Sequence, residues 1–120
     1  MRRPFDGSYP ITQPYGLTPF WAENRASYPT PGHAGVDYGL PAGTQLLAPV
    51  AGYIRSGWQG DTGWGYWLEI GTPLGRHVLA HCKYRSLQAP NGSTVIEGQP
   101  IGKSGDTGWA VGPHLHYEVR

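Results

Sequence analysis

Short runs of alternating apolar and polar residues, each bounded by glycine or proline, constrain this chain to a β fold. Such runs occur at residues 45–48, 51–56, 66–70, 77–82 and 114–120. Alternation with a period of two puts successive side chains on opposite faces of a strand, and Gly and Pro favour the turns between strands. The 19 Gly and 12 Pro are accompanied by 5 Trp, 8 Tyr and 2 Phe, which supply a core. We therefore expect an all-β domain with an antiparallel sheet and little or no helix.

The N-terminal part of the chain, residues 1–32, differs from the remainder. It is rich in proline and aromatic residues and shows hardly any periodicity. We expect residues 1–120 to form a single domain in which 1–32 is an irregular, loop-rich segment packed on the sheet. A segment of this length without regular structure is either a functional loop or a peripheral cover over a sheet edge.

Composition excludes several classes of function. The formal net charge is +1 and 14% of residues are charged, so no basic face for nucleic acid is expected. No run approaches the roughly 20 apolar residues that span a bilayer, and the basic start at Met1 is followed by Pro4 and Asp6 instead of the apolar stretch of a signal peptide. The single cysteine, Cys82, excludes an internal disulfide.

The C-terminal run carries chemistry on one face. As a strand, it places His114, His116 and Glu118 on one side and Leu115 and Tyr117 on the other, which suits a core. Two imidazoles separated by two residues lie about 7 Å apart along a strand. Both can therefore address one metal ion or one metal-bound water, although a pair of histidines alone proves little.

A second histidine occurs close to an acid near the start of the β region. In a straight strand His33 and Asp37 would lie about 13 Å apart, too far to share an ion. They converge only if the backbone bends before the strand, which Gly32 and Gly35 permit. The spacing therefore predicts a ligand pair at a loop-to-strand corner.

The run 77–82 adds a further candidate. His81 lies near the strand end and can reach a common site, whereas His77, about 13 Å away along the strand, cannot. We expect His77 to be an exposed hairpin residue, with His77, Leu79 and His81 on one face. Cys82 then points away from His81 and is expected to be a small core residue.

The candidate set is thus His33, Asp37, His81, His114 and His116. A catalytic zinc typically takes three His or carboxylate ligands with water in the fourth position, which would leave two histidines for proton transfer and electrostatic stabilisation. Spacing alone does not assign the individual roles, and a chance cluster is the alternative.

Several motifs together resemble the lysostaphin/LytM-type zinc endopeptidases, which cut peptide bonds in bacterial peptidoglycan. The resemblance is carried by His33-x-Gly-x-Asp37, the lone His81 at a strand end, and the Gly-Pro-His-Leu-His-Tyr-Glu run at 112–118. Further similar stretches lie at 11–16, 41–44, 48–54 and 98–108, so that the resemblance covers about residues 9–119.

The resemblance implies that His33, Asp37 and His116 hold one zinc ion per chain and that His81 and His114 are the catalytic histidines. It also implies an antiparallel sheet forming the floor of a groove walled by loops. The expected substrate is a peptide crosslink or stem peptide of peptidoglycan, and the chain is expected to act as a monomer.

Large aromatic residues occur in the loops where groove walls are expected. These candidates for substrate contact are Trp21, Tyr28, Trp58, Trp64 and Trp109. Loop packing is the alternative interpretation, since aromatic side chains dominate both kinds of contact.

Three other functions compete with the zinc endopeptidase. A non-catalytic peptidoglycan-binding or scaffolding relative would lack a ligand, and none is missing here. A structural zinc module would use Cys-rich ligand sets, and a zinc hydrolase for small molecules would have a deep closed pocket. Because no signal peptide is expected, the setting that fits is a phage-encoded lysin, a virion-associated wall hydrolase or an excised domain of a larger protein.

Overall fold

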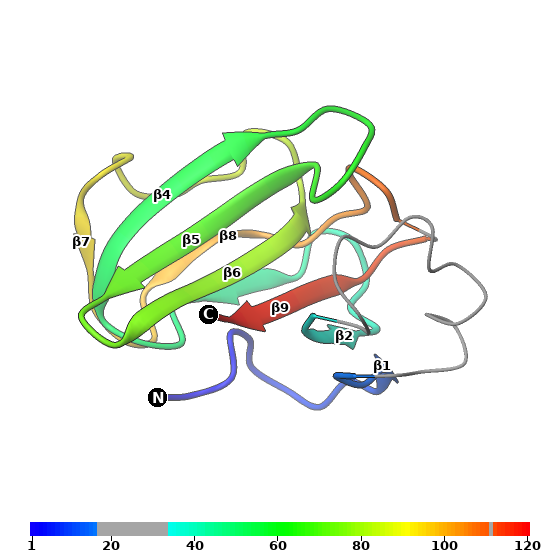
Figure 1. The fold of residues 1–120 in the computed structure, drawn as a ribbon, viewed down its shortest axis with the longest axis horizontal. Helices are drawn as coiled ribbons and strands as arrows, with labels where there is room; N and C mark the ends of the chain where they lie inside the picture. The colour runs from blue at the N-terminus through cyan, green and yellow to red at the C-terminus, as the bar shows by residue number, and fades with distance from the viewer. Residues whose placement is uncertain (17–33, 111) are drawn as a thin grey trace.

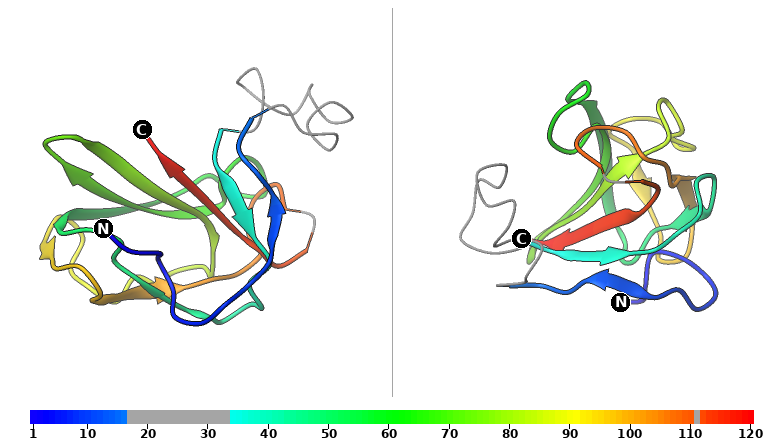
Figure 2. Two further views of the ribbon diagram at one scale, coloured as in Figure 1. Left: turned by 90° about the horizontal axis from the view of Figure 1, so that it is seen from below. Right: turned by 90° about the vertical axis from the view of Figure 1, so that its right-hand side faces the viewer.

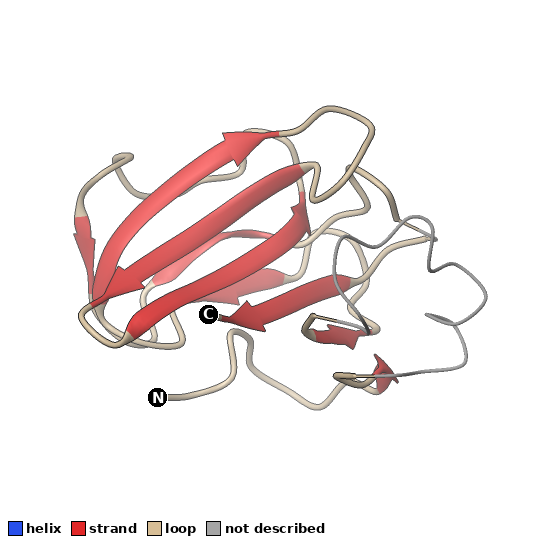
Figure 3. Ribbon diagram, in the orientation of Figure 1, coloured by secondary structure: helices blue, strands red, loops and turns tan. Residues whose placement is uncertain are grey.

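The computed structural model describes residues 1–16, 34–110 and 112–120. These residues form nine strands and no helix (Figures 1 and 3). In chain order the strands are β1 (Ile11–Gln13), β2 (Val36–Tyr38), β3 (Gln45–Leu47), β4 (Gly52–Trp58), β5 (Tyr66–Thr72), β6 (Gly75–Cys82), β7 (Thr94–Val95), β8 (Pro100–Lys103) and β9 (Leu115–Val119). The described part of the chain accordingly contains no helix suited to crossing a membrane.

The strands form two antiparallel sheets. The larger has the order β1-β2-β9-β6-β5-β4-β7, and the smaller pairs β3 with β8. Figures 1 and 2 show β3 and β8 on one side of the larger sheet, and no other described strand covers its opposite side, here called the open face. The last strand, β9, lies between β2 and β6, so residues from the two ends of the described β region become neighbours.

The core fills the space between the two sheets. Leu46 of β3 and Ile101 of β8 are fully buried against Ile54, Leu68 and Leu79 of the larger sheet. Leu115 of β9 also belongs to this core, and Tyr117 packs against it. The expected all-β antiparallel fold is confirmed, because alternating runs between Gly/Pro turns can bury one face only by pairing in sheets.

The N-terminal segment is more ordered than expected at two places. Residues 11–13 form β1, which pairs with β2 at the edge of the larger sheet. Phe5 is 1% exposed and packs edge-on against Tyr38. Neither feature is detectable as periodicity, because a three-residue strand and a single buried ring produce no repeat.

A β-bulge interrupts β6 at His81. Leu68 of β5 pairs with Leu79 and Tyr66 pairs with Cys82, so two residue steps on β5 face three on β6. His81 takes a left-handed backbone conformation with φ of 61°. Leu79 and Cys82 therefore both point into the core, and His81 turns to the open face. The prediction for Cys82 is confirmed, whereas the expectation that His81 and Leu79 share a face is wrong, since a bulge resets the alternation.

The expectation that His77 is exposed is also wrong. Its exposed fraction is 6%, and its Nδ1 atom lies 2.6 Å from the Tyr117 hydroxyl oxygen. The reason is topological: β9 pairs along β6 with Val119 opposite His77, so this end of the hairpin is not a sheet edge. Val119 itself, the last residue of β9, is 60% exposed.

Candidate active site

The centre of the site is a pair formed by Asp37 and His116. Asp37 lies on β2 directly opposite His116 on β9, and the Asp37 Oδ1 atom is 2.8 Å from His116 Nδ1. Both residues are buried. Gly35 allows this close approach, because a Cβ atom there would lie 2.4 Å from the Tyr117 carbonyl oxygen. Gly35 thus allows the chain before β2 to approach β9 closely, a role different from the backbone bend that the sequence suggested.

The second ring nitrogen of His116 also has a carboxylate partner. His116 Nε2 lies 2.7 Å from Glu118 Oε1, and Arg120 Nε donates to Glu118 Oε2 over 2.6 Å. Burial alone would lower the pKa of His116, but the hydrogen bonds to Asp37 and Glu118 outweigh it and raise the pKa to about 9. Burial would likewise raise the pKa of Glu118, but hydrogen bonds from His116 and Arg120 lower it.

His114 faces the same carboxylate from the end of the loop before β9. Its Nε2 atom lies 3.8 Å from Asp37 Oδ2, and its Nδ1 atom lies 3.0 Å from the Gly112 carbonyl oxygen. A carbonyl only accepts, so Nδ1 carries the proton. Nε2 is thus the ring nitrogen of His114 that faces the Asp37 carboxylate.

His81 completes the group from β6. Its ring centroid lies 4.6 Å from that of His114 and 6.1 Å from that of His116. Its Nδ1–H donates to the Thr107 carbonyl oxygen over 2.7 Å. Burial, reinforced by the neighbouring His114, lowers the pKa of His81 to about 4, so this imidazole is neutral at pH 7.

Asp37 and His116 supply a carboxylate and an imidazole, two kinds of donor that bind zinc. A buried carboxylate faces a buried imidazole whose other nitrogen is held by Glu118, which is the outer arrangement typical of metal-bound histidine. Among residues 1–16, 34–110 and 112–120, no set of three His, Cys, Asp or Glu side chains is arranged to hold an ion. His33, the third predicted ligand, lies outside the described residues.

The aromatic residues predicted to line the groove differ in their surroundings. Trp64 lies beside the site, with the Arg120 guanidinium 5.0 Å from its ring centroid. Trp58 instead packs on Tyr84, with a centroid distance of 4.7 Å. Trp109 is half-buried, and its backbone N–H donates to the Gly63 carbonyl. Trp21 and Tyr28 lie outside the described residues.

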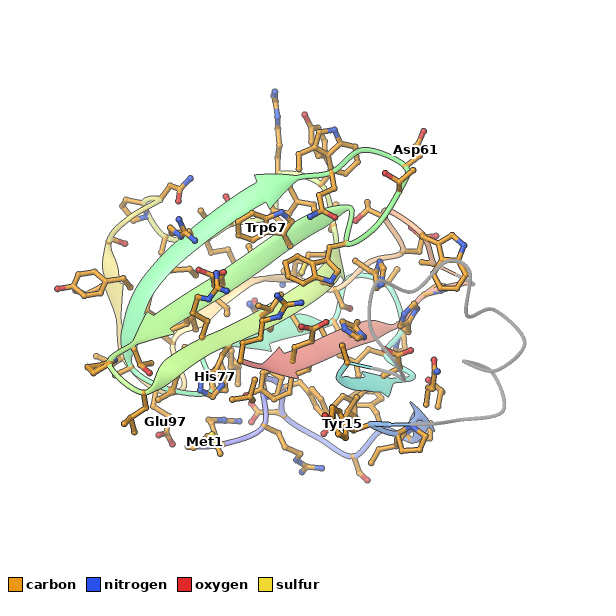
Figure 4. All side chains as sticks on the ribbon, viewed as in Figure 1. Met1, Tyr15, Asp61, Trp67, His77 and Glu97 are labelled. Atoms are coloured by element: carbon orange, nitrogen blue, oxygen red, sulfur yellow. The ribbon has the colours of Figure 1, made fainter. Side chains whose placement is uncertain are left out.

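One aromatic residue of the site was not anticipated. Trp67 of β5 stands on the open face (Figure 4), 6.1 Å from Trp64 between ring centroids. A Cβ atom on Gly57 would lie 2.3 Å from the Trp67 ring, so the indole lies over Gly57 on β4. The alternation of β5 provides the signal for Trp67: its neighbour Leu68 faces the core, so Trp67 must face the other side of the sheet.

Fold and site together define a class: a hydrolase-type centre of histidines and carboxylates on the open face of an antiparallel sheet. Comparison with known proteins identifies the family. Residues 31–120 match Peptidase family M23, a range that includes His33, Asp37, His81, His114 and His116. This chain belongs to Peptidase family M23, and the resemblance to lysostaphin/LytM-type enzymes is confirmed.

Curated relatives include proteins named as endopeptidases. The DD-carboxypeptidase/endopeptidase Mpg of Neisseria meningitidis serogroup B is 40% identical over 90 residues, covering 73% of this chain and 20% of Mpg. Lysostaphin of Staphylococcus staphylolyticus is 33% identical over 87 residues, covering 72% of this chain and 18% of lysostaphin. The chain thus spans about a fifth of the length of these relatives.

Solved structures support the same fold. The catalytic domain of EnpA, a prophage-encoded M23 protein from Enterococcus faecalis, superposes with a TM-score of 0.78 at 28% identity, covering 99% of this chain and 85% of that one. The catalytic domain of lysostaphin from Staphylococcus simulans superposes with a TM-score of 0.75 at 28% identity, covering 91% and 77%.

Proposed function

We propose that this chain is a zinc-dependent endopeptidase that hydrolyses peptide crosslinks or stem peptides of bacterial peptidoglycan. The observation that carries the proposal is the buried Asp37–His116 pair with two further imidazoles, His81 and His114, directly beside it. The similarity to the peptidoglycan DD-endopeptidase ShyC of Vibrio cholerae, 37% identical over 90 residues, supports the substrate class.

His33, Asp37 and His116 would hold one zinc ion per chain. Bound there, zinc supplies Lewis acidity that activates a water and polarises a scissile carbonyl. Glu118 keeps His116 oriented with its Nδ1 atom toward Asp37, so the ligand does not have to reorganise when the ion binds.

His81 and His114 would be the catalytic histidines. Each donates its Nδ1 proton to a backbone carbonyl, of Thr107 and of Gly112 respectively, and their ring centroids lie 4.6 Å apart. One would accept a proton from the attacking water, and the other would stabilise the developing oxyanion or protonate the leaving amine.

Trp64 would line the substrate groove together with Trp21, Tyr28 and Trp109, whereas Trp58 packs on Tyr84. The stacking of Trp64 with Arg120 presents a flat aromatic and cationic surface next to Glu118. We further propose that the chain acts as a monomer on the cell wall, as a bacteriolytic phage endolysin, a virion-associated hydrolase or the catalytic domain of a larger protein. The similarity to a prophage-encoded M23 protein supports a phage setting.

The test combines metal analysis with defined substrates. We expect His81→Ala and His114→Ala to retain one zinc per chain and lose most turnover, and His33→Ala, Asp37→Ala and His116→Ala to lose the metal. Digestion of peptidoglycans with different crosslinks, followed by mass spectrometry of the new amino termini, identifies the bond. Zinc binding without cleavage of any of them would instead indicate a peptidoglycan-binding relative.

A further inference from the structure

The bulge at His81 depends on contacts from outside its own hairpin. The left-handed backbone at His81 is unfavourable for a residue with a Cβ atom, so neighbouring structure must hold it. The His81 N–H donates to the Trp64 carbonyl over 2.8 Å. This contact joins the bulge to the loop that leads into β5.

That loop packs directly against a second loop, the one that precedes β9. The Trp109 N–H donates to the Gly63 carbonyl over 2.9 Å. A Cβ atom on Gly65 would lie 2.4 Å from the Gly108 nitrogen, and one on Gly108 would lie 2.2 Å from the Gly65 nitrogen. The two backbones are therefore in contact, and no side chain can enter between them.

Thr107 lies at this junction and makes three contacts. Its hydroxyl oxygen accepts a hydrogen bond from the Tyr66 N–H over 3.0 Å, and its O–H donates to the Cys82 carbonyl oxygen over 2.5 Å. Tyr66 and Cys82 are the strand pair that closes the bulge. The Thr107 carbonyl accepts from His81 Nδ1 over 2.7 Å.

We propose that Thr107 is a positioning residue for His81: its hydroxyl bridges Tyr66 and Cys82 across the bulge while its carbonyl orients the imidazole. The inference rests on the proposed catalytic role of His81. Because side chain and carbonyl belong to one residue, the anchored hydroxyl places the carbonyl at the distance that the His81 ring requires.

The test compares isosteric and conservative replacements. Thr107→Val keeps the shape and removes the hydroxyl, whereas Thr107→Ser keeps the hydroxyl. Thr62→Val is the matched control, since the Thr62 hydroxyl donates to the Gln59 carbonyl within its own loop and has no contact with His81. Measured quantities are kcat and KM on the peptidoglycan fragment that the unaltered chain cleaves fastest, zinc content, and the NMR signal of the His81 Nδ1 proton.

We expect Thr107→Val to lower kcat at least tenfold with KM and zinc content within twofold, and to lose the Nδ1 proton signal through faster exchange. Thr107→Ser and Thr62→Val should stay within threefold of the unaltered chain. Equal losses in Thr107→Val and Thr107→Ser, an unchanged Nδ1 signal in Thr107→Val, or a loss of zinc parallel to kcat would each overturn the proposal.

A substitute variant and a measurement independent of turnover complete the experiment. If Thr107→Val fails to fold, Thr107→Ala removes the hydroxyl and leaves room for water, and the same losses are expected. If the unaltered chain cleaves no peptidoglycan, the proposed function fails. The His81 proton signal in the Thr107 variants still decides whether Thr107 orients this ring, because that measurement needs no turnover.

Discussion

Glu118 Oε1 lies 2.7 Å from Nε2 of His116, two residues away on β9, and the other oxygen of Glu118 is held by Arg120. A ring nitrogen hydrogen-bonded to a carboxylate fixes the orientation of an imidazole and raises its basicity toward a metal. The interaction depends only on a strand period of two and is thus built into the local sequence.

Removing the charge of Glu118 should weaken metal binding. Glu118→Gln is expected to lower zinc affinity roughly 10- to 100-fold, the usual cost of losing an outer partner of a metal-binding histidine. Competition with a chromophoric chelator measures the effect. Glu69→Gln is the matched control. Glu69 is also a buried carboxylate, and it forms ion pairs with Arg55 and Arg76 instead of contacting His116. Equal losses in both variants would contradict the prediction.

Zinc binding should release a proton from His116. Its pKa is raised to about 9, so below that pH the ring is mainly protonated and a metal must displace the proton. Affinity should therefore rise with pH and level off above about 9, with about one proton from His116 released per ion at pH 7. Calorimetry in buffers of different ionisation enthalpy counts the protons.

The variant Glu118→Gln provides the control for this proton count. Losing one of the two carboxylates that raise the pKa of His116 should lower the pH above which zinc affinity levels off and proton release ceases. An identical pH profile in both proteins would show that Glu118 does not control the protonation of His116.

The left-handed backbone at His81 should make glycine more stabilising than alanine at this position. His81→Gly is expected to be more stable than His81→Ala by about 1 kcal/mol, since a Cβ atom disfavours this conformation. Both variants should lose most turnover. Urea unfolding measures the difference, and equal free energies of unfolding would mean that the bulge is not retained in the variants.

Trp64 should affect substrate turnover more than stability. Trp64→Ala is expected to raise KM several-fold and to change the melting temperature little, because the ring stacks on the exposed Arg120. Trp58→Ala, which removes the packing partner of Tyr84, should leave KM unchanged. An unchanged KM in Trp64→Ala would show that Trp64 is a packing residue, and an equal rise in KM in Trp58→Ala would show that the effect is not specific to Trp64.

Local sequence was sufficient for most of the fold. The strands at 45–47, 66–72 and 75–82 coincide closely with alternating runs between Gly/Pro turns. Alternation predicts these strands because one face of the larger sheet is buried against β3 and β8, so apolar residues recur at every second position. The very short β1 has no such signal.

The sequence by itself determined which residues are available for chemistry, since His114, His116 and Glu118 share one face of a strand through its period of two. Only the tertiary structure decided how they combine. The pairing of β2 with β9 brings Asp37 to His116 across 79 positions of sequence, and the bulge turns His81 out of the core side of β6. Strand order and an extra residue in one strand depend on distant hydrogen-bonding partners, and these leave no periodic trace in the sequence of either strand.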